Sequence, residues 1–159
     1  KLLNKDYEKH AKKIYKKNDL FYLGRGLDYA LAMEGSLKLK EISYLHSEAY
    51  ASGELKHGTI SLVEDGTPVI SVMIDDHIRS KSVSNNKEVR ARGGYVIAIS
   101  NTELPNDSYD DLILIPQIND FVNPIMALIP MQMISYYVAK MRGCDIDKPK
   151  NLAKSVTVE

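Results

Sequence analysis

A chain of 159 residues with 21 basic and 21 acidic side chains carries no net charge, which argues against a nucleic acid or an anionic membrane as its partner. Its length fits one domain with a substantial core, and a hydrophobic fraction of 44% is ordinary for a globular protein. The single cysteine, Cys144, excludes an internal disulfide and a cysteine-based zinc site, and no signal peptide or membrane-spanning run is visible, so we expect a reducing, cytoplasmic compartment.

The first segment is predicted to be an amphipathic helix over residues 4–17. Leu3, Tyr7, Ala11 and Ile14 recur at helical spacing, and lysines fill the other face. We assign residues 1–19 to an N-terminal helix or linker that either packs on the following domain or enters from a preceding one. Since the sequence begins without methionine, we expect that it is a piece of a longer protein.

Four short apolar runs predict buried strands, and three longer segments predict helices. The strands are expected at residues 21–24, 68–74, 95–100 and 112–116. The helices are expected at residues 28–46, 76–92 and 121–141. Strands that alternate with helices and are nearly continuous in Val and Ile indicate an α/β fold, with a parallel sheet covered on both faces.

Individual residues refine these helices. In residues 28–46 the inward positions are predicted to be Leu31, Leu37, Ile42 and Leu45. Gly93-Gly94 is expected to end the second helix, and Gly143 the third. Pro130 is expected to break or kink the third helix, because proline lacks the amide hydrogen that a helix interior requires.

Ligands of such folds bind beyond the carboxyl ends of the strands, so the turn after the first strand is a candidate phosphate loop. This turn, Gly24-Arg25-Gly26, departs from the dinucleotide pattern G-x-G-x-x-G because its sixth position is Tyr29. Nucleotide binding is therefore only a minor alternative.

The most heavily charged stretch allows two interpretations. Glu34, Lys38 and Glu41 are spaced to share one helix face, where Glu before Lys is an ordinary surface pair that contributes about 0.2–0.5 kcal/mol. Alternatively they are acid–base groups, since the helix is rich in small residues at one end and leads into residues 52–58. That polar segment carries His57, an imidazole able to titrate near neutral pH. Spacing alone favours the surface pair.

Other kinds of chemistry lack support in the sequence. No two histidines have the spacing of a zinc protease, so we expect no metal and no cofactor. His10, His46 and His77 are interpreted as structural or surface residues. A G-x-S-x-G elbow is absent and Cys144 has no histidine near it in sequence, so a serine or cysteine nucleophile is unsupported.

Three segments carry a resemblance to a known family: ALAMEGSLKLKEISYLHSEAYASGELKHG (residues 30–58), EVRARGG (88–94) and KPKNLAKSVTVE (148–159). They resemble glucosamine-6-phosphate synthases, the isomerizing glutamine–fructose-6-phosphate aminotransferases. The resemblance covers residues 20–159 and implies the C-terminal sugar-isomerase (SIS) domain of that family's isomerase region. It thus implies a SIS domain over residues 20–147, with a parallel sheet of about five strands, and a catalytic tail over residues 148–159.

The family converts fructose 6-phosphate and glutamine to glucosamine 6-phosphate and glutamate, the entry to amino-sugar and UDP-N-acetylglucosamine synthesis. The resemblance implies that Glu41 is the base that moves a proton between C1 and C2 of the sugar. It implies that His57 assists ring opening in the neighbouring subunit's site, and that Lys154 forms a Schiff base with the open-chain sugar. Residues implied to support the substrate site are Glu34, Lys38 and Ala153.

These roles make chemical sense. A 1,2 ketose-to-aldose shift needs one base that takes a proton and returns it to the adjacent carbon. A protonated imine acidifies that carbon, which suits a lysine nucleophile. Lys38, between two glutamates, is expected to keep Glu41 ionised through its positive charge.

The resemblance also implies partners that the chain lacks. The family binds its sugar phosphate through a serine/threonine-rich loop in a preceding SIS domain, and residues 80–86 (SKSVSNN) have neither the glycine nor the threonine of such a loop. A glutaminase domain is also missing. We therefore expect a homodimer that needs both upstream domains, and a fragment incompetent for full turnover. The alternatives are a non-catalytic SIS module that binds a sugar phosphate or dimerises, and a different aldose–ketose isomerase.

Overall fold

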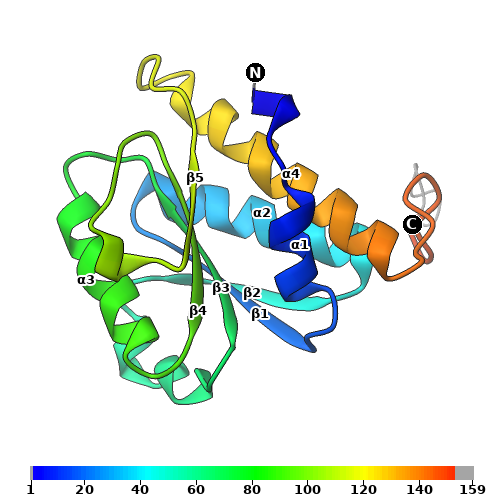
Figure 1. Cartoon of the computed structure of the whole chain (residues 1–159), viewed down its shortest axis with the longest axis horizontal. Helices are drawn as coiled ribbons and strands as arrows, with labels where there is room; N and C mark the ends of the chain where they lie inside the picture. Colours follow the sequence, from blue (N-terminus) through cyan, green and yellow to red (C-terminus); the bar gives the residue numbers. More distant parts are fainter. Residues whose placement is uncertain (1, 153–159) are drawn as a thin grey trace, which may run out of the picture.

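A five-stranded parallel sheet forms the centre of the computed structural model, which describes residues 2–152 (Figure 1). The strand order is β2-β1-β3-β4-β5, and every neighbouring pair is parallel. The strands are β1 (Asp19–Gly24), β2 (His46–Ala51), β3 (Pro68–Met73), β4 (Tyr95–Ser100) and β5 (Asp111–Leu114). The α/β fold and the parallel sheet are confirmed.

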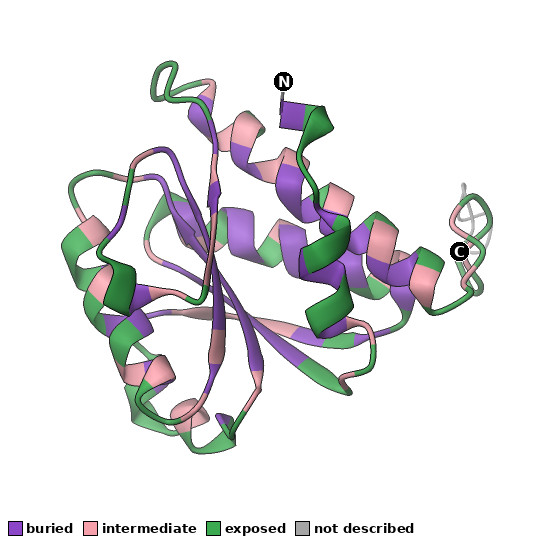
Figure 2. Ribbon diagram, in the orientation of Figure 1, coloured by how far each residue is buried: buried purple, intermediate pink, exposed green. Residues whose placement is uncertain are grey.

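Helices cover both faces of the sheet. The α-helices are α1 (Glu8–Ile14), α2 (Leu27–Ser43), α3 (Arg79–Arg90) and α4 (Asn123–Met141). Short 3-10 helices lie at Leu2–Asn4, Leu55–His57, Thr59–Leu62 and Asn106–Ser108. The larger apolar cluster joins α1, α2 and α4 to one face, and Val89 of α3 belongs to a cluster on the other. Figure 2 shows that the central strands are mostly buried between these layers.

The four strands predicted from apolar runs are all present. The fifth strand, β2, was not predicted from such a run, and it begins where the helix over residues 28–46 was expected to end. That boundary is wrong, because α2 ends at Ser43 and Tyr44 adopts a left-handed conformation with φ 56°. The strand β2 pairs with β1 alone. An edge strand is only partly buried, so its sequence, HSEAYA, carries no continuous apolar run that predicts it.

The N-terminal helix packs on this domain. Tyr7, Ala11 and Ile14 are buried as expected and join the cluster that contains α4. The helix α1 is shorter than predicted, and Leu3 is 65% exposed while its neighbour Leu2 is buried. Residues 2–4 form a separate 3-10 turn, so the helical spacing does not extend to Leu3.

The inward face of α2 is partly different from the prediction. Leu31 is buried, but Leu37 is 43% exposed and Leu39 is buried in its place. The buried face includes Gly35, where a Cβ atom would lie 2.4 Å from Sδ of Met131 in α4. Because α2 and α4 approach this closely, small residues mark the contact face, and the leucine pattern alone misplaces it.

The last helix is continuous through Pro130, so the predicted break is wrong, while the alternative, a kink at this residue, stays a prediction. Pro130 is buried in the helix that packs against α2. The helix ends at Met141, and Gly143 follows with φ 69°, as its predicted role as a stop requires. In the described part of the chain, no helix has the length and apolar character to cross a membrane.

Candidate active site

The side chains of Glu34, Lys38 and Glu41 meet on one face of α2, as their spacing predicts. Nζ of Lys38 lies 2.7 Å from Oε2 of Glu41 and 3.7 Å from Oε1 of Glu34. The hydrogen bond to Glu41 raises the pKa of Lys38, so the ammonium stays protonated. Each of the three side chains is partly exposed, at 41%, 34% and 27% for Glu34, Lys38 and Glu41. A carboxylate that is both accessible and bonded to a fixed cation can accept a proton from a ligand.

The end of α2 that carries Glu41 lies far from the carboxyl edge of the sheet. The helix α2 begins just after β1, at the carboxyl edge, and runs back along the sheet (Figure 1). Glu41 is therefore about 21 Å along the helix axis from Leu27, given the rise per residue of an α-helix. Only the start of α2 reaches the carboxyl edge, whereas Glu34 lies near the middle of the helix and Lys38 and Glu41 lie toward its other end.

The chain after α4 docks at this same end of α2. Tyr44 follows the helix, and its hydroxyl oxygen accepts a hydrogen bond of 2.6 Å from the backbone amide of Lys150. Nζ of Lys150 lies 4.8 Å from the centroid of the Tyr44 ring, a cation–π contact. A cavity of about 400 Å³ lies between Ser43 at the helix end and Cys144. Figure 1 shows both segments on one side of the molecule.

Two of the predicted site residues, Ala153 and Lys154, lie outside the described residues. The last described contacts of the tail are those of Lys150, four residues before Lys154 in the sequence. These contacts are with Tyr44, which is three residues after Glu41. Sequence reasoning did not anticipate Tyr44, because the helix was predicted to run to residue 46 and Tyr44 lies directly after its end only in the structure.

His57 is not brought together with Glu41 within one chain. It is exposed at the end of the 3-10 helix Leu55–His57, which follows β2. Ser52 anchors this segment by donating from its backbone amide and its hydroxyl to the carbonyl of Gly24, at 2.8 and 3.0 Å. Gly24 ends β1, so His57 emerges at the carboxyl edge, whereas Glu41 lies toward the amino ends of the strands. No hydrogen bond or ion pair in residues 2–152 joins the two side chains.

Neither candidate phosphate loop has the form of one. A Cβ at Gly24 would lie 2.2 Å from the carbonyl oxygen of Asp28, so this glycine permits the tight turn into α2. The guanidinium of Arg25, in the same turn, donates a hydrogen bond of 3.3 Å to Oδ1 of Asn85. Residues 80–86 lie inside α3 rather than in a loop, and their buried members face inward.

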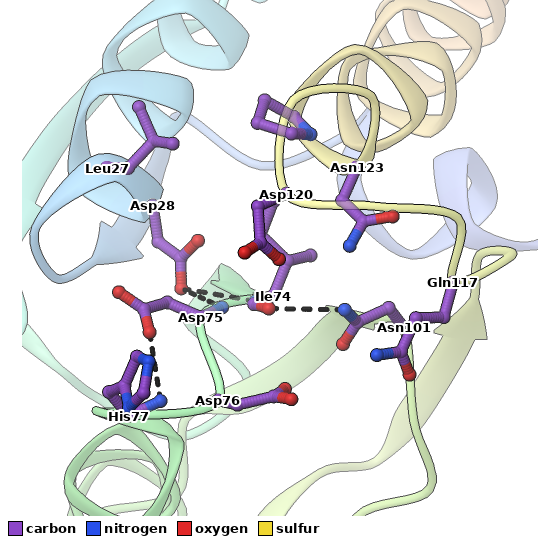
Figure 3. Close-up of a pocket in the computed structure, with 11 residues that line it drawn as sticks. Leu27, Asp28, Ile74, Asp75, Asp76, His77, Asn101, Gln117, Asp120 and Asn123 are labelled. Carbon is purple, nitrogen blue, oxygen red and sulfur yellow. Dashed lines mark hydrogen bonds between the residues drawn. The ribbon is translucent and has the colours of Figure 1, made fainter.

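A second site, which the sequence did not predict, opens at the carboxyl edge. A cavity of about 250 Å³ is lined by residues that follow β1, β3, β4 and β5 (Figure 3). Its acidic members are Asp28, Asp75, Asp76 and Asp120. The Asp75-Asp76 pair directly after a buried strand was the signal that could have indicated it.

Asp28 forms the floor of this cavity. Only 1% of the residue is exposed, and its Oδ2 accepts hydrogen bonds from the backbone amides of Ile74 at 3.1 Å and Asp75 at 3.4 Å. Burial raises the pKa of Asp28 to about 7, although these two amides lower it. No group of three or more His, Cys, Asp or Glu suited to a metal ion occurs in residues 2–152.

The chain is similar to known proteins both in its family model and in its sequence. The SIS domain model matches residues 13–142. The chain is 55% identical over 155 residues to the glutamine–fructose-6-phosphate aminotransferase (isomerizing) of Caldanaerobacter subterraneus subsp. tengcongensis, and 54% identical over 154 residues to that of Clostridium tetani. Each match covers 96% of this chain but only 25% of the relative, so the chain spans about a quarter of the length of these relatives.

A solved structure shares the architecture. The C-terminal domain of glucosamine-fructose-6-phosphate aminotransferase from Francisella tularensis superimposes with a TM-score of 0.84 at 40% identity. That match covers 91% of this chain and 42% of the Francisella chain. More than half of that chain therefore has no counterpart here.

Proposed function

The chain belongs to the SIS domain family, and from that premise we propose that it is the C-terminal isomerase domain of a glutamine–fructose-6-phosphate aminotransferase. The observation that carries the proposal is the partly exposed Lys38–Glu41 pair, with the tail anchored beside it on Tyr44. The substrate is fructose 6-phosphate and the product glucosamine 6-phosphate, as the names and the identity of the relatives suggest.

In this proposal Glu41 takes a proton from C1 of the open-chain sugar imine and returns it to C2. The step transfers hydrogen within one molecule, so it needs neither an oxidant nor a reductant. The carboxylate must be ionised to begin the step, and the Lys38 ammonium, 2.7 Å from its Oε2, holds the carboxylate in position. Glu34, on the far side of Lys38, holds this ammonium in place.

We assign residues 148–159 to a tail that closes over the sugar, with residues 1–19 as the leading helix or linker and 20–147 as the domain body. Lys154 forms a Schiff base at C2 of the open-chain sugar with loss of water, and ammonia then displaces the lysine amine to give the imine that Glu41 isomerises. Ala153 supports the site. The support is the contact between Lys150 and Tyr44, which anchors the described part of the tail beside the end of α2 that carries Glu41.

The site uses two subunits. Glu41 lies toward the amino ends of the strands and His57 lies at their carboxyl ends. This separation favours a homodimer in which His57 assists ring opening in its partner's site. The helix α4 and the loop before it offer apolar surface for such contacts, since Phe121, Ile125 and Tyr136 are 92%, 58% and 40% exposed. Sedimentation equilibrium that gives a monomer at tens of micromolar protein contradicts the dimer.

The remaining parts are supplied by upstream domains: a preceding SIS domain that binds the phosphate, and a glutaminase that releases ammonia. The carboxyl edge of this domain is acidic and would repel a phosphate, in keeping with a phosphate site elsewhere. The missing phosphate loop also leaves a second candidate function, a sugar-phosphate-binding or dimerisation module without turnover.

The test is Glu41→Gln in the longer protein that contains the chain, assayed for glucosamine 6-phosphate. We expect a loss of about 10²–10⁴-fold, the contribution of a positioned general base. The matched control is Glu8→Gln in α1, because Glu8 also pairs with a lysine on an exposed helix face, at 3.0 Å from Lys12. If Glu41→Gln keeps normal turnover while substrate binding persists, the module without turnover is the better description of this site.

A further inference from the structure

The cavity at the carboxyl edge is built around a buried acid with one unused oxygen. Oδ2 of Asp28 accepts two backbone amides, whereas Oδ1 has no hydrogen-bond partner among residues 2–152. Figure 3 shows this carboxyl directed into the cavity. Burying a carboxylate oxygen without a partner is unfavourable, so a structure retains one where a ligand or a proton completes it.

The charges around the cavity decide which ligands suit it. Asp75, Asp76 and Asp120 add three carboxyls to that of Asp28. The nearby Arg79 already has partners for its positive charge. Its guanidinium pairs with Asp76 and donates a hydrogen bond of 2.7 Å to Oδ1 of Asn101. Arg79 compensates the charge of Asp76, but Asp75 and Asp120 form no ion pair within residues 2–152, so an anion such as a phosphate would be repelled and a cation attracted.

The rest of the lining limits the cation to a small organic one. Leu27, Ile74 and Pro124 present apolar atoms, which suit a short aliphatic stem rather than a bare ion. Residues 2–152 contain no cluster suited to direct metal coordination. The volume of about 250 Å³ lies just below the range of roughly 300–1,000 Å³ for drug-sized ligands.

We propose that this cavity binds a small organic ammonium ion, whose ammonium group donates to Oδ1 of Asp28 and whose stem packs on Leu27, Ile74 and Pro124. The position is consistent with the fold, because the cavity lies where β1 and β3 adjoin and the chain crosses from one side of the sheet to the other. The site is distinct from the Lys38–Glu41 pair and does not depend on the function proposed above.

The ionisation of Asp28 gives the binding a characteristic pH dependence. Burial and, to a smaller extent, the charge of Asp75 raise the pKa of Asp28, the two amides and Arg79 lower it, and the net result is a pKa of about 7. An ammonium ion binds the ionised carboxyl, so affinity increases as the pH rises through about 7, and binding lowers the pKa of Asp28 in turn. The other charged or titratable groups of the lining are Asp76, His77 and Asp120.

The amides of Ile74 and Asp75 report directly on Asp28, so two-dimensional nitrogen–proton NMR of the labelled chain is the assay. The probes are propylammonium and its neutral counterpart 1-propanol, titrated at constant ionic strength and at a pH above the pKa of Asp28. We expect saturable shifts of both amides with propylammonium and none with 1-propanol.

Three variants locate the site. Asp28→Asn should weaken propylammonium binding by at least about tenfold, the loss of one charge-assisted hydrogen bond. Asp120→Asn, at the exposed mouth of the cavity, should weaken it about two- to fivefold. The control Asp147→Asn removes the same charge from an exposed position after α4 and should leave the affinity unchanged.

Four results would overturn the proposal. They are equal shifts with 1-propanol, unchanged affinity in Asp28→Asn, an equal loss in Asp147→Asn, and magnesium ions that saturate the same amides more tightly than propylammonium. If Asp28→Asn fails to fold, the exposed Asp120→Asn variant is the test. A loss of propylammonium affinity in that variant supports the proposal, and an unchanged affinity overturns it.

Discussion

Replacing Asp28 with asparagine should change how the stability of the protein depends on pH. Asp28 is 1% exposed, and burial raises its pKa from 3.8 to about 7. In the unfolded chain the carboxyl ionises near pH 4, so between about pH 4 and 7 the folded state binds more protons than the unfolded state. Stability therefore falls as the pH rises through this interval, and the fall ends above the folded pKa.

The size of this effect follows from the pKa difference. A rise from 3.8 to about 7 corresponds to about 4 kcal/mol of unfolding free energy between the two ends of the interval. Asparagine stays neutral throughout, so Asp28→Asn lacks this contribution. The stability of the variant relative to the parent should accordingly increase by about 4 kcal/mol between about pH 4 and pH 8.

Urea denaturation at several pH values measures the difference. The free energy of unfolding falls by about 1–3 kcal/mol per molar urea. A change of about 4 kcal/mol therefore changes the difference between the urea midpoints of the variant and the parent by more than about 1 M. Other titrating groups are common to both proteins and cancel in the difference, as does any pH-independent cost of the asparagine amide. Asp147→Asn serves as the exposed control. Parallel pH profiles for the parent and Asp28→Asn would refute the reasoning.

Three further perturbations test the fold and the tail. Leu39→Ala should destabilise the domain by about 2–5 kcal/mol in urea denaturation, since Leu39 is 0% exposed in the main cluster; a cost comparable to that of exposed Leu37→Ala would contradict its placement. Burial lowers the pKa of His10, whose Nδ1 lies 2.9 Å from Oδ2 of Asp111, so its protonation favours the unfolded state and stability falls as the pH drops below about 6.5. His10→Asn should flatten that fall in urea midpoints measured from about pH 7 to pH 5, and an unchanged fall would assign it to other groups. Tyr44→Phe should speed exchange of the Lys150 amide by about tenfold in hydrogen-exchange NMR, because one hydrogen bond worth about 0.5–1.5 kcal/mol is lost; Tyr136→Phe is the control, and equal effects would exclude the contact.

Local sequence determined the central sheet and the pairing on α2. The strands β1, β3 and β4 are mostly buried runs of Val, Ile and other apolar residues, and the partly buried β5 is apolar over residues 112–114, so neighbours along the chain were sufficient to predict them. The contacts of Lys38 with Glu34 and Glu41 follow from helical spacing alone. The family resemblance added the fifth strand and the identity of the candidate catalytic residues, which spacing could not supply.

Only the tertiary structure decided the features that depend on close packing or on distant segments. The approach of Gly35 to Met131 determines which face of α2 is buried, and so exposes Leu37. The contact between Tyr44 and Lys150 joins residues 106 positions apart. The acidic cavity gathers Asp28, Asp75 and Asp120 from the segments that follow β1, β3 and β5. Periodicity describes the environment of a residue along its own element, whereas these sites depend on how parallel strands bring the ends of different elements to one edge.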